Sequence, residues 1–187
     1  MAKTYNTISS VSTGDVYTAT QHNSIVTNVN NYRVPPMARI TKNGTTRPYT
    51  SATAIAFDNG TTNGYDTDGM YSAGANTRLT VQTAGVYLVV ACIFTAWEVG
   101  SIYGSAGWQF LLRRNAAQIG PGDQVTNIDQ TAVAYRSGLI TQTVSCAVGD
   151  YFDMNLMFSG ASTMNVYGDT TSVGCTSLSL TWLGQAS

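Results

Sequence analysis

The sequence predicts an all-β sandwich or barrel, and three observations support this. From residue 37 onward, roughly nine or ten β-favouring segments alternate with turn-forming residues. Residues 79–82 alternate apolar and polar, and residues 86–96 then form an almost unbroken apolar run, as in a strand covered on both faces. No helical periodicity interrupts this part of the chain. A buried helix is the alternative for 86–96, but Gly85 and the many β-branched and aromatic residues favour a strand.

The strand at 86–97 is the one around which the other strands are expected to be organised. One of its faces should fill the core, and the other face also needs a cover, for which a second copy of the protein is a candidate. Asn43-Gly44 is the strongest hairpin signal. The remaining strands are expected at residues 38–42, 53–57, 70–72, 77–82, 108–114, 132–146, 151–158, 162–167 and 176–183.

Composition argues against several classes of function. Charged residues make up 10% of the chain, and the net charge is −1 without a basic block, so nucleic acid is not an expected partner. No apolar run approaches a membrane span, and no secretory signal follows Lys3, so we expect synthesis in a cytoplasm and no membrane insertion. The three cysteines, Cys92, Cys146 and Cys175, are expected as small core residues, with a disulfide between two of them left open.

The first 37 residues differ from the rest. Thr18 and Gln21 have the spacing of a capping box, which predicts a helix over 19–32. Pro35-Pro36 ends the helix and makes a stiff junction. We interpret residues 1–37 as an attachment segment with a hinge and residues 38–187 as a head domain. The helical side chains expected to contact a partner are Ile25, Val26, Val29 and Tyr32.

Catalytic and metal-binding patterns are weak. The only histidine, His22, lies in the predicted helix, so no catalytic triad with histidine can form in the head, and we expect no enzyme and no cofactor. Asp58, Asp66 and Asp68 supply oxygen ligands of the kind that Ca²⁺ prefers, although aspartates are also ordinary turn residues and that interpretation is favoured.

Four aromatic residues lie in or near Gly-rich loops and are candidates for contact with a receptor or a glycan. Packing of the loops or contacts between subunits is the alternative explanation for each of them. The four are Tyr65, Tyr103, Trp108 and Tyr167.

Several short motifs together resemble the globular head of complement component one-q and the related tumour necrosis factor fold. They are Ala84-Gly85-Val86-Tyr87, Leu112-Arg113-Arg114-Asn115, Ala147-Val148-Gly149-Asp150 and the closing Leu178-x-Leu180-x-Trp182. The resemblance covers about residues 38–184. It implies a ten-stranded jelly roll that forms a homotrimer, with 86–97, 151–158 and 176–183 in one inner sheet. The trimer contacts expected on this basis are Tyr87, Val89, Ile93, Tyr151 and Met157.

The N-terminal stretch from Thr13 to Asn23 is similar to the start of many tailed-phage virion proteins, in which "GDVxTAxxxN" precedes a fibre or decoration domain. The two resemblances together imply a homotrimeric head fibre, spike or decoration protein on the virion surface. Its partner would be a capsid or tail protein, bound through residues 1–37. The alternative is a receptor-binding tail fibre tip that recognises a host surface glycan. A depolymerase is a third hypothesis, but nothing singles out a carboxylate pair.

Overall fold

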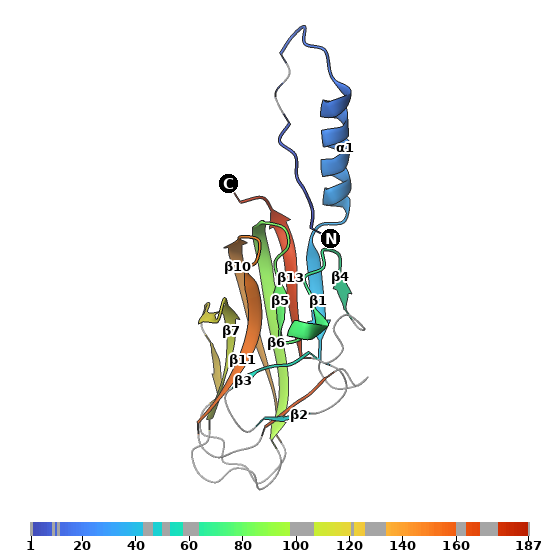
Figure 1. Ribbon diagram of the computed structural model, residues 1–187. Helices are drawn as coiled ribbons and strands as arrows, with labels where there is room; N and C mark the ends of the chain where they lie inside the picture. The colour runs from blue at the N-terminus through green and yellow to red at the C-terminus, as the bar shows by residue number, and fades with distance from the viewer. Residues whose placement is uncertain are drawn as a thin grey trace.

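The computed structural model describes residues 2–8, 10, 12–42, 47–49, 53–57, 64–97, 107–120, 122–125, 134–159, 164–168 and 176–186. Two antiparallel sheets pack face to face, and one helix extends beyond one end of the sandwich (Figure 1). The elements are α1 (Ala19–Arg33), β1 (Met37–Thr41), β2 (Arg47–Tyr49), β3 (Thr53–Ala54), β4 (Tyr65–Asp66), a 3₁₀ helix (Ala73–Ala75), β5 (Arg78–Thr80), β6 (Gly85–Trp97), β7 (Gly107–Arg114), β8 (Ala117–Gln118), β9 (Asp123–Val125), β10 (Ala134–Cys146), β11 (Tyr151–Ser159), β12 (Met164–Val166) and β13 (Ser177–Gly184).

The first sheet, which we call the β6 sheet, has β10, β6, β13, β1 and β4 as neighbours, and β12 and β2 continue it beside the end of β6. The second, the β11 sheet, has β3 and β5 on one side of β11 and β7 with β8 and β9 on the other. Side chains from both sheets fill the core between them. The predicted jelly-roll sandwich is confirmed, and short strands such as β3, β4 and β8 bring the described strands above the expected ten.

Strand β6 is confirmed as the central strand. It pairs with β10 along its whole length, from Gly85 opposite Cys146 to Trp97 opposite Ala134, and with β13 on its other side. Its side chains alternate between the two faces, because successive residues of a strand point in opposite directions. The core face carries Tyr87, Val89, Ala91 and Ile93, all fully buried.

The placement of residues 151–158 in the same sheet as 86–97 was wrong. Strand β11 pairs with β7 and β5 in the opposite sheet, and β10 rather than β11 joins the sheet of β6. The turn around Gly149, with φ +92°, carries the chain across the sandwich from β10 to β11. An alternating strand has the same pattern in either sheet, so the pattern of β11 does not reveal which sheet it joins.

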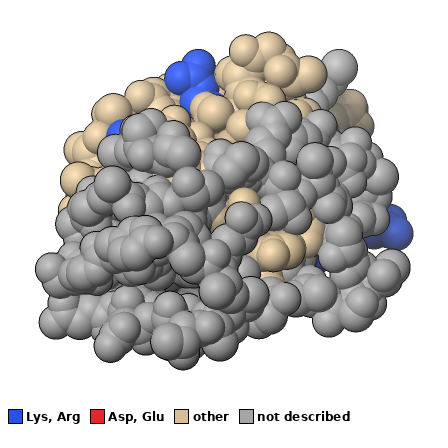
Figure 2. Space-filling view, turned by 90° about the horizontal axis from the view of Figure 1, so that it is seen from below, with Lys and Arg blue, Asp and Glu red and all other residues tan. Residues whose placement is uncertain are grey.

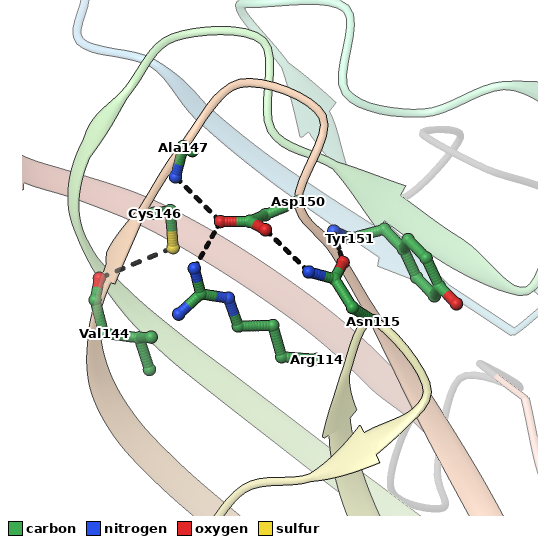
Figure 3. Close-up of polar contacts among 7 residues, drawn as sticks. All are labelled: Arg114, Asn115, Val144, Cys146, Ala147, Asp150 and Tyr151. Atoms are coloured by element: carbon green, nitrogen blue, oxygen red, sulfur yellow. Dashed lines mark hydrogen bonds and ion pairs between the residues drawn. The ribbon is translucent and has the colours of Figure 1, made fainter.

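The motif residues around Asp150 join two turns at one end of the sandwich (Figure 3). The Asp150 carboxylate accepts hydrogen bonds from Arg114 Nη2, from Asn115 Nδ2 at 2.7 Å and from the Ala147 N–H at 2.7 Å. Asn115 Oδ1 in turn accepts the Tyr151 N–H at 3.0 Å. Burial raises the pKa of Asp150, but the bonds from Asn115, Arg114 and Ala147 outweigh burial and hold that pKa below its ordinary value.

Gly85 explains part of the other motif. Its φ is +155°, and a Cβ there would lie 2.0 Å from Trp182 Nε1 and 2.5 Å from the carbonyl oxygen of Gly184. Only glycine fits where β6 begins beside the end of β13.

Candidate functional site

The outward face of the β6 sheet is the first candidate surface. The β6 side chains that point away from the core are half-buried, and neither of the two described sheets lies over Leu88, Val90 and Cys92 on this side. On the same side of the sheet, the residues of β10 and β13 that pair with these β6 residues carry mostly hydroxyl side chains, with one leucine in β10. We define the outward face as Leu88, Val90, Cys92 and Phe94 of β6, Leu139, Thr141 and Thr143 of β10, Ser179 and Thr181 of β13, and Arg39 of β1.

This face is apolar at its centre and uncharged over most of its area. Leu139, opposite Cys92, exposes 64% of its surface. Burial raises the pKa of the Cys92 thiol, and the charge of Arg39 lowers it in part, so the thiol is a neutral member of the face. Apolar side chains that gather on one sheet face mark a surface used for association.

The predicted trimer contacts do not lie on this face. Tyr87, Val89 and Ile93 are fully buried within the subunit, and the Tyr87 hydroxyl donates to the carbonyl of Thr83 at 2.6 Å. They are core residues, so the prediction chose the wrong face of β6. In an unbroken apolar run both faces look alike, and only the pairing register separates them.

The other two predicted contacts lie on the opposite side of the molecule. Tyr151 and Met157 point outward from the β11 sheet, because Phe152, Met154 and Leu156 between them fill the core. The guanidinium of Arg78 lies over the Tyr151 ring, 4.5 Å from its centroid.

The N-terminal arm, which we define as the described residues between 2 and 33, is the second candidate surface. Helix α1 begins at the predicted capping box, with Thr18 and Gln21 bonded reciprocally, and has no buried residue. Residues 2–8, which we call the strap, lie beside the helix, with their N-terminal end at the head (Figure 1). Asn28 Oδ1 accepts the Asn6 N–H and Asn28 Nδ2 donates to the Asn6 carbonyl, both at 2.9 Å, and Asn31 Nδ2 donates to the carbonyl of Thr4 at 2.6 Å.

The strap also binds the head. The Tyr5 ring stacks on Trp182 at 4.7 Å between centroids, and Tyr32 lies 5.3 Å from Tyr5 and 5.6 Å from Trp182. The Lys3 N–H donates to Thr83 Oγ1 at 2.8 Å. The sequence does not predict this role of residues 2–8, since a short polar segment carries no signal of where it packs.

The predicted attachment residues therefore divide between two settings. Ile25 is half-buried on the same side of α1 as Asn28, whereas Val26 and Val29 are exposed on another side. Tyr32 belongs to the ring cluster at the head. The arm exposes three further apolar side chains at Ile8, Val16 and Tyr17.

The Pro35-Pro36 junction is held by the head. Thr67 Oγ1 donates to the carbonyl of Pro35 at 2.7 Å and accepts the Met37 N–H at 2.9 Å. The Trp182 N–H donates to the carbonyl of Pro36 at 2.9 Å. These bonds would have to break before the junction could act as a hinge.

Of the candidate calcium ligands, Asp66 serves another contact. The Asp66 carboxylate accepts the backbone N–H groups of Asp68, Gly69, Met70 and Tyr71, so it organises its own loop. Asp58 lies outside the described residues. Within the described ranges, no three His, Cys, Asp or Glu side chains come together as metal ligands.

The candidate catalytic, thiol and membrane features can be placed in the same way. His22 lies on α1 with its ring against the edge of Tyr17, 6.2 Å between centroids. Cys92 and Cys146 are free thiols, and Cys175 lies outside the described residues. In the part of the chain that the structure describes, no helix has the length and hydropathy to cross a membrane.

The candidate loop aromatics do not form one described cluster. Tyr65 lies on β4 opposite Arg39, at the edge of the β6 sheet. Tyr167 packs edge-on against Phe94, 6.0 Å between centroids. Tyr103 and the Trp108 side chain lie outside the described residues. Figure 2 views the end of the molecule opposite α1, where the described surface shows a few basic and no acidic side chains.

No family model matches this sequence, and no curated protein matches it. Solved structures are similar in fold. The Eiger tumour necrosis factor of S. frugiperda aligns over 82% of this chain and 96% of its own, with 12% identity and a TM-score of 0.53. The globular domain of the zebrafish complement 1qA protein aligns over 81% of this chain and 100% of its own, with 11% identity and a TM-score of 0.52. The head therefore has the jelly-roll fold shared by tumour necrosis factor and complement one-q domains.

Proposed function

We propose that this chain is a structural protein of a bacteriophage virion, a homotrimeric head fibre, spike or decoration protein anchored by its N-terminal arm. The observation that carries the proposal is the outward face of the β6 sheet. Its centre, at Leu88, Val90 and Cys92, is apolar and only half-buried by the described part of the chain. A second and third copy supply that cover.

The edge of the same sheet supports self-association. Among the described strands, β10 pairs with β6 alone, so its other edge leaves backbone groups available to a neighbouring subunit, and Leu139 adds an exposed apolar side chain. Packing the β10 edge of one subunit against the outward face of the next buries both. Repeated around a threefold axis, this contact closes into a ring.

Rotational symmetry about one axis places the three arms at the same end of the trimer. Each arm offers a small exposed apolar set, including Val16, Val26 and Val29. One such set binds weakly, but three linked sets act together through their high effective concentration. With the arms at one end and the heads at the other, the trimer suits a surface protein that is attached at one end and displays its head at the other.

The oligomeric state is measured first, by sedimentation equilibrium on the full chain and on residues 38–187. A trimer of both species supports the proposal, and a monomer of the full chain at micromolar concentration refutes it.

Attachment is tested separately, by quantifying the full chain and the 38–187 chain in purified particles of the phage that encodes it. We expect the truncated trimer to be absent from particles. Its incorporation at the normal level would show that the arm is not the anchor. Recognition of a host glycan, the alternative function, instead predicts that Tyr65→Ala abolishes adsorption while the trimer stays intact.

A further inference from the structure

The strap lies on a surface that binds it mainly through its backbone. We call this surface the strap site and define it as Asn28, Asn31 and Tyr32 of α1 with Thr83 and Trp182 of the head. The Asn28 amide both donates to and accepts from the backbone of one strap residue, as a neighbouring strand would, and Asn31 and Thr83 bond to two further backbone groups. Nearly every peptide carries these backbone groups, so the bonds give affinity without selecting a sequence.

One side chain of the strap supplies the specificity. The Tyr5 ring stacks on Trp182 with 4.7 Å between centroids and an interplanar angle of 12°, and Tyr32 lies 5.3 Å from the same ring. Lys3 and Tyr5 are half-buried, whereas the other residues of the strap are exposed. The strap site therefore fits an elongated peptide with an aromatic ring at one position.

The hydroxyl of Tyr5 does not suit this position. It is buried, and it has no hydrogen-bond partner among the described residues. A buried hydroxyl without a partner loses its hydration and gains nothing in exchange. Phenylalanine would keep the stacked ring and remove the hydroxyl, so the strap site fits phenylalanine better than it fits the tyrosine of the strap.

The other contacts of the strap are ones that a competing peptide can replace. The bonds to Asn28 and Asn31 are exposed, and no residue of the strap is buried. Exposed hydrogen bonds contribute little each, because water replaces them when they break. The covalent link to α1 gives the strap a high effective concentration at the site, and this compensates for weak contacts. A peptide that binds the site more tightly can therefore displace the strap.

We propose that the strap site binds an elongated peptide segment that carries a phenylalanine, supplied by a protein of the particle, and that this segment displaces the strap. The incoming segment takes over the backbone bonds to Asn28 and Asn31, so α1 keeps its support while the strap is freed. The particle as the source of the segment rests on the proposed virion function, because the site lies on the arm that attaches there. The site itself does not rest on it.

Fluorescence anisotropy with labelled synthetic peptides tests the site on the full chain. The probes have the sequence of residues 2–8, with tyrosine, phenylalanine or alanine at the position of Tyr5. We expect the phenylalanine probe to bind about fivefold more tightly than the tyrosine probe, and the alanine probe not to bind. In the chain, Tyr5→Ala weakens the strap and should tighten binding of the phenylalanine probe by about tenfold.

Three outcomes of this experiment overturn the proposal. The first is a phenylalanine probe that does not bind the Tyr5→Ala chain at millimolar concentration. The second is an alanine probe that binds as tightly as the phenylalanine probe. The third is a phenylalanine probe that binds no more tightly than the tyrosine probe.

N-methylation of the probe distinguishes binding at the strap site from unspecific stacking of an aromatic peptide, and it leaves the chain unmodified. Methylation at the position of Asn6 removes the N–H that donates to Asn28 and should weaken binding by about fivefold. Methylation at the position of the exposed Ile8 is the matched control and should leave binding unchanged. Equal effects of the two methyl groups would mean that the peptide binds elsewhere and would refute the site.

A benzophenone side chain introduced at position 32, beside the Tyr5 ring, tests the source of the segment in purified particles. Irradiation should join this position to a segment of another particle protein, which mass spectrometry of the digested product identifies. Cross-links to residues 2–8 alone would mean that a strap still occupies the site and would overturn the proposal. Absence of the chain from particles would refute the virion function and the particle source together, whereas the probes still decide the site, and sedimentation reports the trimer separately.

Discussion

Leu139→Glu is the sharpest test of the outward face. Leu139 lies on β10, opposite Cys92, and its side chain points away from the core, so the substitution does not disturb the packing of the subunit. In the proposed trimer this side chain is buried against a neighbour. Val148→Glu is the matched control, because Val148 also exposes 64% of its surface but lies in the turn before β11.

The magnitude follows from the exposed area. Burying a whole leucine side chain stabilises by about 1.5–3 kcal/mol, so the exposed part of Leu139 contributes about 1–2 kcal/mol per copy. Three copies contribute about 3–6 kcal/mol, which is about two to four decades in the trimer dissociation constant. Burying the Glu charge adds to this, so the estimate is a lower bound.

The assay is sedimentation equilibrium at several concentrations, with chemical denaturation of the monomer as the check on folding. Leu139→Glu should be a folded monomer at concentrations where the unmodified chain and Val148→Glu are trimers. If Leu139→Glu remains a trimer with an unchanged dissociation constant, the outward face is not the interface.

Three further predictions concern stability. Gly85→Ala should lower the free energy of unfolding, measured by chemical denaturation, by about 3 kcal/mol or more, because the added Cβ meets Trp182 and backbone. Gly149→Ala, also at positive φ but in open space, should lower it by about 1 kcal/mol. Equal losses would show that the close approach of Trp182 to Gly85 does not limit stability. Asp150→Asn should lower the free energy of unfolding by about 1–3 kcal/mol at pH 7. Because folding lowers the pKa of Asp150, this difference from the unmodified chain should disappear as the pH falls well below 3.8. A difference in stability that is constant with pH would show that the Asp150 carboxylate is not ionised in its hydrogen bonds. Thr18→Ala removes the N-cap of α1 and should lower the stability of the helix by about 1 kcal/mol, which speeds amide exchange in its first turn by about fivefold. An unchanged exchange rate would mean that the strap alone stabilises the helix.

The fold was largely predictable because its signals are local. The Thr18–Gln21 capping box, the alternation of Phe152, Met154 and Leu156, and the glycine-bearing turns each report on a few neighbouring residues. Which strand β11 pairs with, and which side chains of β6 face the core, both depend on contacts between distant segments. An apolar run such as 86–94 does not reveal either.

The asparagines of α1 show how the two candidate surfaces are linked. Asn28 and Asn31 are poor helix formers, and a helix of this length with no buried residue is marginal alone, so its stability has to come from tertiary contacts. The strap supplies those contacts. Asn28 and Asn31 bind its backbone, and Tyr5 of the strap stacks on Trp182 of the head. A released strap therefore leaves both α1 and its orientation less defined. In a trimer, three docked straps would hold three arms in one geometry, and this shared geometry is what converts weak contacts at Val26 and Val29 into a single firm attachment.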